Sequence, residues 1–291
     1  MTGRRVAVVA AVVCALGSVA APAKKASKPA PKLPDTSWAK LAAAARVAKI
    51  EEARKLKLGD RLTTLSEPFL GTPYVLSPLG EGSGRDPDPL IRYDAVDCLT
   101  MVEETIAMAL APDANDLLPT LNRVRYAGDE QRYEARNHLM EAQWLPNNVA
   151  HGFLKPVTRR YAGDATKRAV KVLTAKTWDE KGAKALALPK SVQSKGEFEL
   201  DIVSADDALK AALEAPSGTV VVVVRADRPW LVTRVSHVAF LVQSNKGPML
   251  RHASRSFARV VDEPLEQYLT RNLDYGAWTI EGLSFYEVVA P

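Results

Sequence analysis

Residues 93–104 read YDAVDCLTMVEE, and this stretch decides what the rest of the chain is expected to build. The apolar residues after Cys98 recur every three or four positions, a spacing typical of the buried face of an α-helix. They are Leu99, Val102, Ile106 and Leu110, and the helix should end before Pro112. Asp97 is expected to cap this helix, so Cys98 falls in the first turn, where backbone N–H groups and the helix dipole favour a thiolate.

The chain contains two cysteines, and only one is expected in the mature protein. Residues 1–23 carry two arginines, then a run of small and apolar residues, and end in Ala-Pro-Ala, which is the pattern of a secretory signal peptide. This run is shorter than the roughly 20 residues that span a membrane, and no later segment is apolar enough. Cys14 would leave with the signal. Cys98 would then have no second cysteine for a disulfide and is expected to be reactive; a buried structural cysteine is the alternative.

A short basic segment separates the signal from the folded part. Residues 24–36 are rich in Lys, Pro and Ala, which predicts an extended linker. Residues 1–36 hold six Lys and Arg and one acidic residue, so the 39 basic and 34 acidic residues of the whole chain leave 33 of each for residues 37–291. This neutral remainder gives no reason to expect nucleic acid binding. It is long enough for one large core, so we expect a single domain.

The remaining patterns place helices before strands. Residues 38–58 are rich in Ala, Lys, Arg and Glu with apolar residues near helical spacing, which predicts a helical start to the domain. Residues 80–89 are dense in Gly, Pro and Asp and predict a loop. Later, residues 219–224 form a β-branched run, and residues 231–242 and 248–254 also have the composition of strands. The order indicates an α+β fold with an antiparallel sheet.

A thiolate nucleophile needs a proton acceptor, and the chain has four histidines, His138, His151, His237 and His252. Residues 244–247 are a turn-like tetrad between two expected strands, which predicts a hairpin. With a four-residue loop, His237 and His252 point to the same face as diagonal neighbours about 7–8 Å apart at the backbone, whereas a three- or five-residue loop would separate them. We expect His237 to be the general base and His252 to orient it. Structural histidines are the alternative.

Several motifs resemble one family, the papain-like NlpC-type cell-wall cysteine peptidases, and within it the N-acetylmuramoyl-L-alanine amidase-like branch. Residues 71–74 (GTPY) resemble the family's Gly-x-Pro-Tyr turn, and residues 97–103 (DCLTMVE) resemble its nucleophile helix. Residues 236–240 (SHVAF) are similar to its Ser-His-Val-Gly strand, and residues 250–254 (LRHAS) to the next strand. Residues 132–148 resemble the Arg-aromatic-Trp segment that separates this branch from its relatives.

The resemblance spans residues 71–254, with a few departures. Met101 replaces an aromatic residue, Ala239 replaces a glycine, and the Gly-Asp before the histidine strand appears as Gly-Thr. Residues 155–200 match weakly, as an insert would. None of these departures removes a residue of the expected triad. The resemblance implies a papain-like α+β domain, in which a helical N-terminal lobe presents the nucleophile to an antiparallel sheet or half-barrel.

The resemblance also implies hydrolysis of an amide in peptidoglycan, either between N-acetylmuramic acid and L-alanine or within the stem peptide between D-Glu and the diamino acid. Cys98 would attack the carbonyl carbon, and His237 would protonate the leaving amine and then activate water, with His252 as the third member. The backbone N–H of Cys98 and, by analogy, the hydroxyl of Tyr74 would stabilise the oxyanion. A turn aromatic is the alternative for Tyr74, and an acyltransferase with the same triad is the alternative reaction.

Candidate substrate contacts lie in the arginine-rich segment and around the triad. Arg136 and His138 are expected to hold a stem-peptide carboxylate or sugar hydroxyls, since a guanidinium suits bidentate carboxylate binding. Trp144 is expected to stack on a sugar or an alanine methyl group. Asp97 and Ser236 flank the triad and are candidates for the same site. The alternative places Trp144 in the core and Arg136 in an ion pair.

Other classes of protein fit the sequence less well. A zinc hydrolase needs three ligands, and His138 and His151 lack the His-Glu-x-x-His spacing, so neither a metal nor another cofactor is expected. A non-catalytic wall-binding protein has no use for a thiol at a helix start. We therefore expect a monomeric hydrolase, exported to the periplasm or cell envelope and without a transmembrane segment after signal cleavage. It would act on peptidoglycan or muropeptide fragments and not on nucleic acid.

Overall fold

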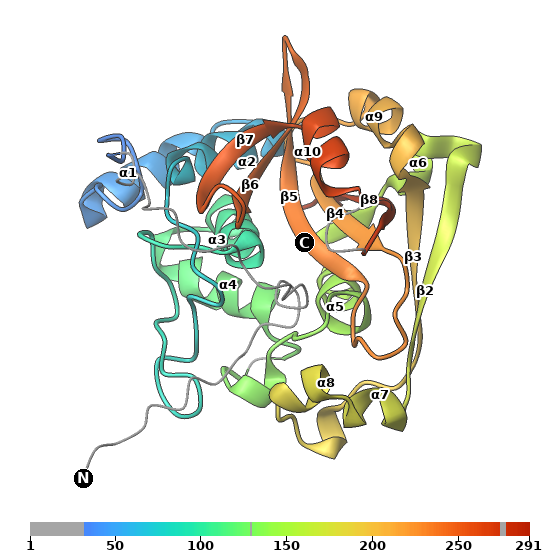
Figure 1. Cartoon of the computed structure of the whole chain (residues 1–291). Helices are drawn as coiled ribbons and strands as arrows, with labels where there is room; N and C mark the ends of the chain where they lie inside the picture. Colours follow the sequence, from blue (N-terminus) through green and yellow to red (C-terminus); the bar gives the residue numbers. More distant parts are fainter. Residues whose placement is uncertain (1–31, 129, 274–277) are drawn as a thin grey trace.

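The computed structural model describes residues 32–128, 130–273 and 278–291 (Figure 1). The expected signal peptide, residues 1–23, lies outside them, as does most of the linker, residues 24–36. Among the described helices, none is long and apolar enough to cross a membrane. The described residues cover nearly all of the domain that the sequence predicts.

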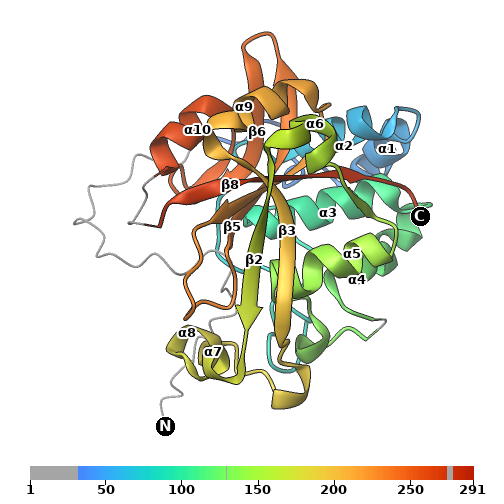
Figure 2. The ribbon, with the colours of Figure 1, turned by 90° about the vertical axis from the view of Figure 1, so that its right-hand side faces the viewer.

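An antiparallel sheet of eight strands lies at the centre of the described fold (Figure 2). The strand order is β2-β3-β8-β4-β5-β6-β7, with the short β1 paired to β8. The strands are β1 (Leu154–Pro156), β2 (Thr166–Leu173), β3 (Gly196–Ser204), β4 (Val220–Arg225), β5 (Val235–Ser244), β6 (Gly247–Ser254), β7 (Arg259–Pro264) and β8 (Ile280–Val288). Because β8 lies between β3 and β4, the C-terminal strand joins the two halves of the sheet.

Helices cover both faces of this sheet (Figures 1 and 2). The α-helices are α1 (Ala43–Ala53), α2 (Leu58–Ser66), α3 (Cys98–Leu110), α4 (Leu117–Arg125), α5 (Leu145–Ala150), α6 (Thr158–Ala162), α7 (Ala175–Asp179), α8 (Lys181–Ala185), α9 (Ala205–Glu214) and α10 (Leu265–Asn272). Helix α3 packs against β5 and β6, with α2 and α4 beside it. The mixture of helices and an antiparallel sheet confirms the α+β prediction.

Strand β4 shows how the layers arise from the sequence. Its valines alternate between two core clusters, one that contains α3 and one that contains α9 and α10: Val220, Val222 and Val224 belong to the first, and Val221 and Val223 to the second. Because successive side chains of a strand point to opposite faces, β4 is buried on both sides. This burial explains its unbroken run of valines and confirms the strand predicted at residues 219–224.

The hairpin of β5 and β6 has the predicted register but a shorter loop. Leu241 pairs with Leu250, as predicted, and the pairing continues to Ser244 and Gly247, so the loop has two residues instead of four. The turn is tight because Gly247 adopts a φ of +95°, which L side chains rarely tolerate. Shortening the loop by two residues preserves the alternation of side chains, so both histidines of the hairpin remain neighbours.

The helical start predicted over residues 38–58 is confirmed by α1, which ends at Ala53, and α2 begins at Leu58 after a break. The guanidinium of Arg61 donates to the backbone oxygens of Arg54 and Leu56 at 2.8 and 3.2 Å. These bonds satisfy carbonyl groups at the end of α1, where the helix itself supplies no partner. The break allows α1 and α2 to pack against each other and against α3.

The weakly matching residues 155–200 belong to the same sheet. They form α6, β2, α7, α8 and the start of β3, and β2 pairs with β3 along its whole length. Lys171 on β2 is buried, and its Nζ donates to Oδ1 of Asp227 at 2.8 Å and to the backbone oxygen of Arg228 at 2.9 Å. The segment therefore anchors the loop that leads into β5.

Candidate active site

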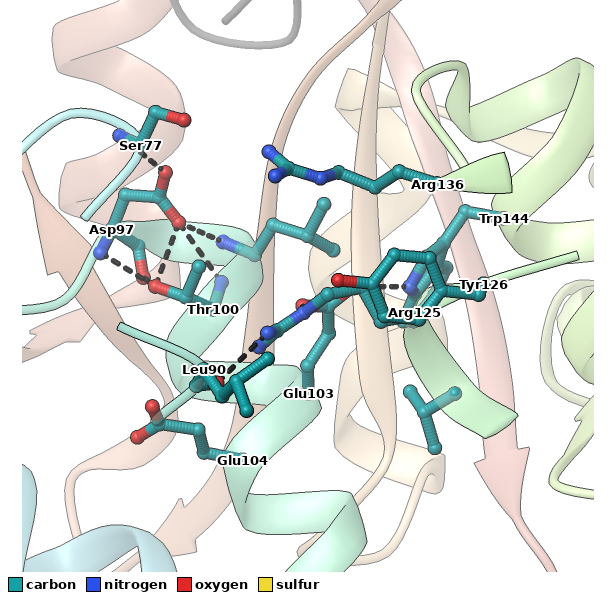
Figure 3. A network of polar contacts seen from close by, with 12 residues as sticks. Ser77, Leu90, Asp97, Thr100, Glu103, Glu104, Arg125, Tyr126, Arg136 and Trp144 are labelled. Atoms are coloured by element: carbon teal, nitrogen blue, oxygen red, sulfur yellow. Dashed lines mark hydrogen bonds and ion pairs between the residues drawn. The ribbon is translucent and has the colours of Figure 1, made fainter. Parts of the chain in front are cut away.

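Asp97 caps α3 and thereby fixes the position of Cys98 (Figure 3). Its Oδ1 accepts the N–H groups of Leu99 and Thr100 at 3.1 and 2.8 Å, and the Thr100 hydroxyl accepts the Asp97 N–H at 2.9 Å. Its Oδ2 accepts the N–H of Ser77 at 3.0 Å. The predicted cap is confirmed, and both carboxylate oxygens bind groups of the protein itself. Cys98 is buried as the first residue of the helix.

The turn that carries Tyr74 lies beside the residues that lead into α3. Tyr74 forms a parallel bridge with Val96, and the Val75 N–H donates to the Val96 oxygen at 3.0 Å. The Tyr74 N–H donates to the oxygen of Ala258, in the turn between β6 and β7, at 3.0 Å. The Tyr74 side chain packs against the core cluster that contains Cys98. This turn therefore connects the start of α3 with the outer strand of the sheet.

His237 on β5 and His252 on β6 contact each other directly. Nε2 of His237 lies 2.7 Å from Nδ1 of His252, and the two rings are nearly perpendicular, with an interplanar angle of 86°. The other nitrogen of His252, Nε2, lies 3.1 Å from Oε2 of Glu263 on β7. The two histidines are thus neighbours, as the hairpin register predicts, and a carboxylate on the next strand continues the contact.

An arginine from α10 holds this carboxylate. Nε and Nη2 of Arg271 donate to Oε1 and Oε2 of Glu263 at 3.0 and 2.7 Å. Burial would raise the pKa of Glu263, but hydrogen bonds from His252 and Arg271 lower that pKa below its ordinary value. Glu263 is therefore ionised at neutral pH although it is largely enclosed.

Tyr268 on α10 contacts both histidines and lies within electrostatic reach of the thiol. Its ring stacks on His237, with centroids 5.7 Å apart at 19°, and meets the edge of His252 at 5.5 Å and 89°. Burial raises the pKa of the Tyr268 hydroxyl, and the charge of a Cys98 thiolate acts in the same direction. Tyr268 therefore links the start of α3 to the pair of histidines.

Burial and nearby positive charges keep His237 neutral. Burial lowers the pKa of His237 well below its ordinary value, and the charges of His252, Arg225 and Arg271 lower it further. Arg225 is fixed near the ring because its Nε donates at 2.9 Å to the hydroxyl of Ser236, the residue before His237. A neutral imidazole has a lone pair and can accept a proton. His237 therefore has the protonation state of a base at neutral pH.

Arg136 is engaged by two carboxylates from the loop predicted over residues 80–89. Its Nε and Nη2 lie 2.9 and 2.5 Å from Oε1 of Glu81, and its Nη2 lies 2.9 Å from Oδ2 of Asp86. The Tyr126 hydroxyl also donates to Glu81, at 3.0 Å. The geometry corresponds to the alternative in which Arg136 belongs to an ion pair. Its guanidinium fastens the loop to the rest of the domain.

Trp144 and His138 also face the interior. Trp144 is fully buried, and its Nε1 donates to Oε1 of Glu103 at 2.9 Å, so it has no exposed surface on which a sugar could stack. Nε2 of His138 lies 2.7 Å from the backbone oxygen of Tyr133. Burial lowers the pKa of His138 to about 4. Neither residue lies at the histidine pair on β5 and β6.

Two consecutive glutamates of α3, Glu103 and Glu104, are buried near Arg125 and Trp144 (Figure 3). Glu103 accepts from Nε of Arg125 at 3.0 Å as well as from Trp144, and Arg125 also donates to the oxygen of Leu90 at 2.9 Å. Burial raises the pKa of the adjacent Glu104 to about 8. The first turns of α3 are thus fixed by a cap at one end and by a buried ion pair on one side.

Within residues 32–128, 130–273 and 278–291, no group of three or more His, Cys, Asp or Glu side chains could hold a metal ion. His151 follows α5, and its Nδ1 lies 3.1 Å from the backbone oxygen of Arg123. It makes its contact with α4 and takes no part in the pair formed by His237 and His252.

Comparison with known proteins shows the family to which the chain belongs. The family model described as AmiA-like, N-acetylmuramoyl-L-alanine amidase-like, matches residues 64–276. The chain belongs to the N-acetylmuramoyl-L-alanine amidase-like family. Membership of this amidase-like family supports a hydrolase that acts on an amide of the cell wall. The matched region includes Cys98, His237, His252 and Glu263. A search of curated proteins found no match.

Solved structures share the fold of this member of the amidase-like family. A Legionella pneumophila protein aligns with a TM-score of 0.74 at 24% identity, covering 85% of this chain and 94% of that chain. An N-acetylmuramoyl-L-alanine amidase from Bacteroides uniformis aligns with a TM-score of 0.64 at 25% identity, covering 80% of this chain and 99% of that chain. The α+β architecture with its antiparallel sheet is therefore common to these proteins.

Sequence reasoning missed Glu263, Tyr268 and Arg271. The structure pairs His252 on β6 with Val261 on β7, and Glu263 is the next residue on that face of β7, but this register could not be read from the sequence. Tyr268 and Arg271 are three residues apart and so share one side of α10. Nothing in their local sequence indicates that this side faces the histidines.

Proposed function

We propose that this protein is an exported cysteine amidase with a papain-like fold, which cleaves the amide between N-acetylmuramic acid and L-alanine in peptidoglycan. Cys98 is the nucleophile, His237 the general base and His252 the third member of the triad. One observation carries the proposal: α3, which begins at Cys98, packs against β5 and β6, the strands that carry the two histidines, and Tyr268 stacks on His237. A thiol at a capped helix start and a pair of histidines therefore lie on elements that pack against each other. The family supplies the class of substrate.

The reaction proceeds in two halves. In the first, the Cys98 proton moves to His237, the thiolate attacks the amide carbonyl carbon, and an electron pair moves to the carbonyl oxygen. When the carbonyl re-forms, the C–N bond breaks, His237 gives its proton to the L-alanine nitrogen, and a thioester remains on Cys98. In the second half, His237 takes a proton from water, and the hydroxide attacks the thioester. Cys98 then leaves as a thiolate and takes the proton back from His237, while the acid that forms loses its proton to solvent. The products are a lactyl carboxylate and a free stem peptide.

The oxyanion of both tetrahedral intermediates needs hydrogen-bond donors. We assign this role to the backbone N–H of Cys98, at the positive end of the α3 dipole, and to the hydroxyl of Tyr74. The turn that carries Tyr74 is fixed against Val96, two residues before the nucleophile. Removing one such donor typically costs about 10²–10³-fold in kcat.

The neutral state of His237 is consistent with its role as base. Its lowered pKa means that the resting site holds an imidazole rather than an imidazolium. The proton then leaves the thiol as the substrate is attacked, and His237 carries a positive charge only while a thiolate or a tetrahedral intermediate is present. Glu263 provides a negative charge one ring away from His237.

Three of the expected substrate contacts enter the proposal as residues that shape the site. A ligand carboxylate reaches Arg136 only by displacing Glu81 or Asp86, which already bind its guanidinium. His138 and Trp144 support the same region from the interior of the domain.

The other two expected contacts hold parts of the proposed machinery in place. The carboxylate of Asp97 accepts N–H groups of the first turn of α3 and so fixes the backbone that carries Cys98. The hydroxyl of Ser236 accepts from Arg225 and keeps that guanidinium beside the base. Both residues act through their neighbours rather than on the substrate.

Mass spectrometry of digested muropeptides tests the proposal. The wild-type protein should release stem peptides that begin with L-alanine and leave a peptide-free disaccharide. Cys98→Ala and His237→Gln should each lower the rate of release by at least about 10³-fold, with thermal unfolding close to wild type. His151→Gln is the matched control and should keep full activity.

Other outcomes of the same experiment identify other enzymes. Cleavage after D-Glu would identify a stem-peptide endopeptidase, and a product in which the acyl group has moved to an amine would identify an acyltransferase. Turnover retained by Cys98→Ala would refute the thiol mechanism. Export is tested separately, because the protein recovered from the periplasm or cell envelope should begin after Ala23.

A further inference from the structure

Four charged or titratable side chains form a chain of contacts behind the proposed base. From Arg271 it passes to Glu263 at 2.7 Å, to His252 at 3.1 Å and to His237 at 2.7 Å. They come from four elements, α10, β7, β6 and β5. His252 is 1% exposed and Glu263 5% exposed, so neither group can exchange its protein partner for bulk water without a change in structure.

Arg271 and Glu263, at one end of this chain, determine which ring nitrogens carry hydrogen. A guanidinium only donates, so both oxygens of Glu263 that face Arg271 act as acceptors. An ionised carboxylate has no proton to give, so Nε2 of His252 must carry hydrogen and donate to Oε2 of Glu263. In the neutral ring, Nδ1 of His252 then holds the lone pair. The contact of 2.7 Å therefore requires Nε2 of His237 to carry hydrogen and donate to that lone pair.

We infer that Glu263, held by Arg271, is a positioning residue that sets the tautomers of His252 and His237 and leaves Nδ1 of His237 as the atom that accepts the Cys98 proton. The inference rests on the proposed function for the identity of the nucleophile, and the tautomers follow from the contacts when Glu263 is ionised and both rings are neutral. When the proton moves from Sγ of Cys98 to Nδ1 of His237, every hydrogen bond in the chain keeps its direction. No proton needs to cross the chain, and the new positive charge on His237 is separated from the Glu263 carboxylate by one ring.

Other groups around the two rings leave this assignment unchanged. Tyr268 meets both rings through its own ring face and edge, so it restricts their orientation without adding a proton donor at a ring nitrogen. Arg225 and Arg271 act on His237 through their charge. Asp262, the residue before Glu263 on β7, points to the other face of the strand, where its carboxylate pairs with Arg251 rather than with the histidines.

Glu263→Gln tests the inference because the carboxylate accepts from three N–H groups: Nε2 of His252 and Nε and Nη2 of Arg271. The amide of Gln has only one acceptor oxygen for them. When the amide NH₂ group takes the place of Oε2, Nε2 of His252 has to accept and its Nδ1 has to donate. Nε2 of His237 then has to accept in turn, so Nδ1 of His237 carries hydrogen and cannot take the thiol proton. When the amide lies the other way, its NH₂ group opposes Nε of Arg271 and the tautomers stay as they are. Each arrangement leaves one guanidinium N–H unmatched, so the variant should populate both.

Asp262→Asn is the matched control. It neutralises the adjacent carboxylate of another bidentate arginine pair and leaves the contacts of the histidines in place. The experiment is long-range ¹H–¹⁵N spectroscopy of the histidine rings, at a pH at which both rings are neutral, together with hydrolysis rates on muropeptides. Wild type and Asp262→Asn should show hydrogen on Nε2 of both rings, and Glu263→Gln should show a second population with hydrogen on Nδ1 of both.

The kcat of Glu263→Gln should fall by about 10–100-fold with KM nearly unchanged, because Glu263 acts on the base through His252. Part of this loss comes from the molecules whose base is in the wrong tautomer. The rest comes from the missing negative charge, which in the wild type stabilises the imidazolium that forms when His237 takes the proton. Asp262→Asn should keep the kcat of wild type.

The outcomes separate this inference from the proposed function. Hydrogen on Nδ1 of His252 in the wild-type protein would overturn the inference, and this measurement does not depend on how the variants fold. A folded Glu263→Gln with the tautomers and the kcat of wild type would overturn it as well. The inferred tautomers together with full hydrolysis by His237→Gln would leave the tautomer assignment standing and would instead refute His237 as the base.

Discussion

The indole N–H of Trp144 donates to Oε1 of Glu103 across 2.9 Å, and so ties the segment before α5 to the second turn of α3. The other oxygen of Glu103 accepts from Arg125 at 3.0 Å, and both members of this ion pair are 3% exposed. A buried carboxylate that loses one of its donors keeps its charge but not its solvation, which is more costly than losing a bond between neutral groups.

Trp144→Phe should therefore lower the free energy of unfolding by about 1–3 kcal/mol through the lost bond to Glu103, beyond any change in packing. Trp178→Phe is the control, because Nε1 of Trp178 donates to the backbone oxygen of Ser194, a neutral partner in a partly buried position. Urea denaturation of the three proteins measures both losses. An equal loss in the two variants would show that the charge of Glu103 adds nothing.

Glu104→Gln should make the protein more stable at neutral and alkaline pH. Burial raises the pKa of Glu104 to about 8, with the charges of Glu103 and Asp97 acting in the same direction. The contribution of this group to stability is therefore fully present below the pKa of an unfolded glutamate, and it is lost as pH rises through about 8. The Gln side chain stays neutral and can still accept the Arg92 N–H.

The difference in unfolding free energy between Glu104→Gln and wild type should grow by about 4 kcal/mol between pH 4.5 and pH 8. Denaturation curves at several pH values measure it. Glu52→Gln, at an exposed position on α1, should give a curve parallel to that of wild type. A difference that does not change with pH would mean that Glu104 is ionised in the folded protein.

His138 should make the protein sensitive to acid. Burial, together with the charges of Arg136 and Arg85, lowers the pKa of His138 to about 4. A group with a lowered folded pKa contributes stability above its unfolded pKa of roughly 6.5 and loses it as pH falls toward the folded value. Relative to His138→Gln, wild type should lose about 3 kcal/mol between pH 7 and pH 4. Thermal melts over this range measure the loss, and His151→Gln should follow wild type throughout.

Tyr268 should act on activity through its ring. Tyr268→Phe keeps the stack on His237 and should hold kcat within about threefold of wild type, whereas Tyr268→Leu removes the stack and should lower kcat by about 10–100-fold. Tyr161→Leu removes a tyrosine that packs on the same core cluster from α6, and it should leave kcat unchanged. Comparable losses in the Phe and Leu variants would show that the hydroxyl, rather than the ring, is what matters.

Local patterns were sufficient to predict the elements that carry the proposed triad. The cap at Asp97 and the apolar spacing after Cys98 depend on neighbours within one helix, and the structure confirms both. The continuous valines of β4 predict a strand for the same reason, and the structure shows that it is buried on both faces. The hairpin register was predicted through the alternation of side chains, which is insensitive to an error of two residues in the loop.

Contacts between distant segments could not be predicted in this way. The guanidinium of Arg136 has the chemistry of a carboxylate binder, and it does bind carboxylates, but they are Glu81 and Asp86 of the same chain. Composition also could not show that Arg61 would take over the carbonyl groups at the end of α1. A polar side chain has the same chemistry toward a ligand and toward a loop that folds over it.

The two halves of the proposed site come from separate parts of the sequence, Cys98 from α3 and the proton-handling residues from the continuous stretch β5 to α10. Before folding, the thiol has neither a helix dipole nor a base within reach. The unfolded chain therefore has no assembled catalytic site and should be inactive. If the chain crosses a membrane unfolded through a translocation channel, the site assembles only after export. No inhibitor is then needed to keep the hydrolase inactive in the cytoplasm.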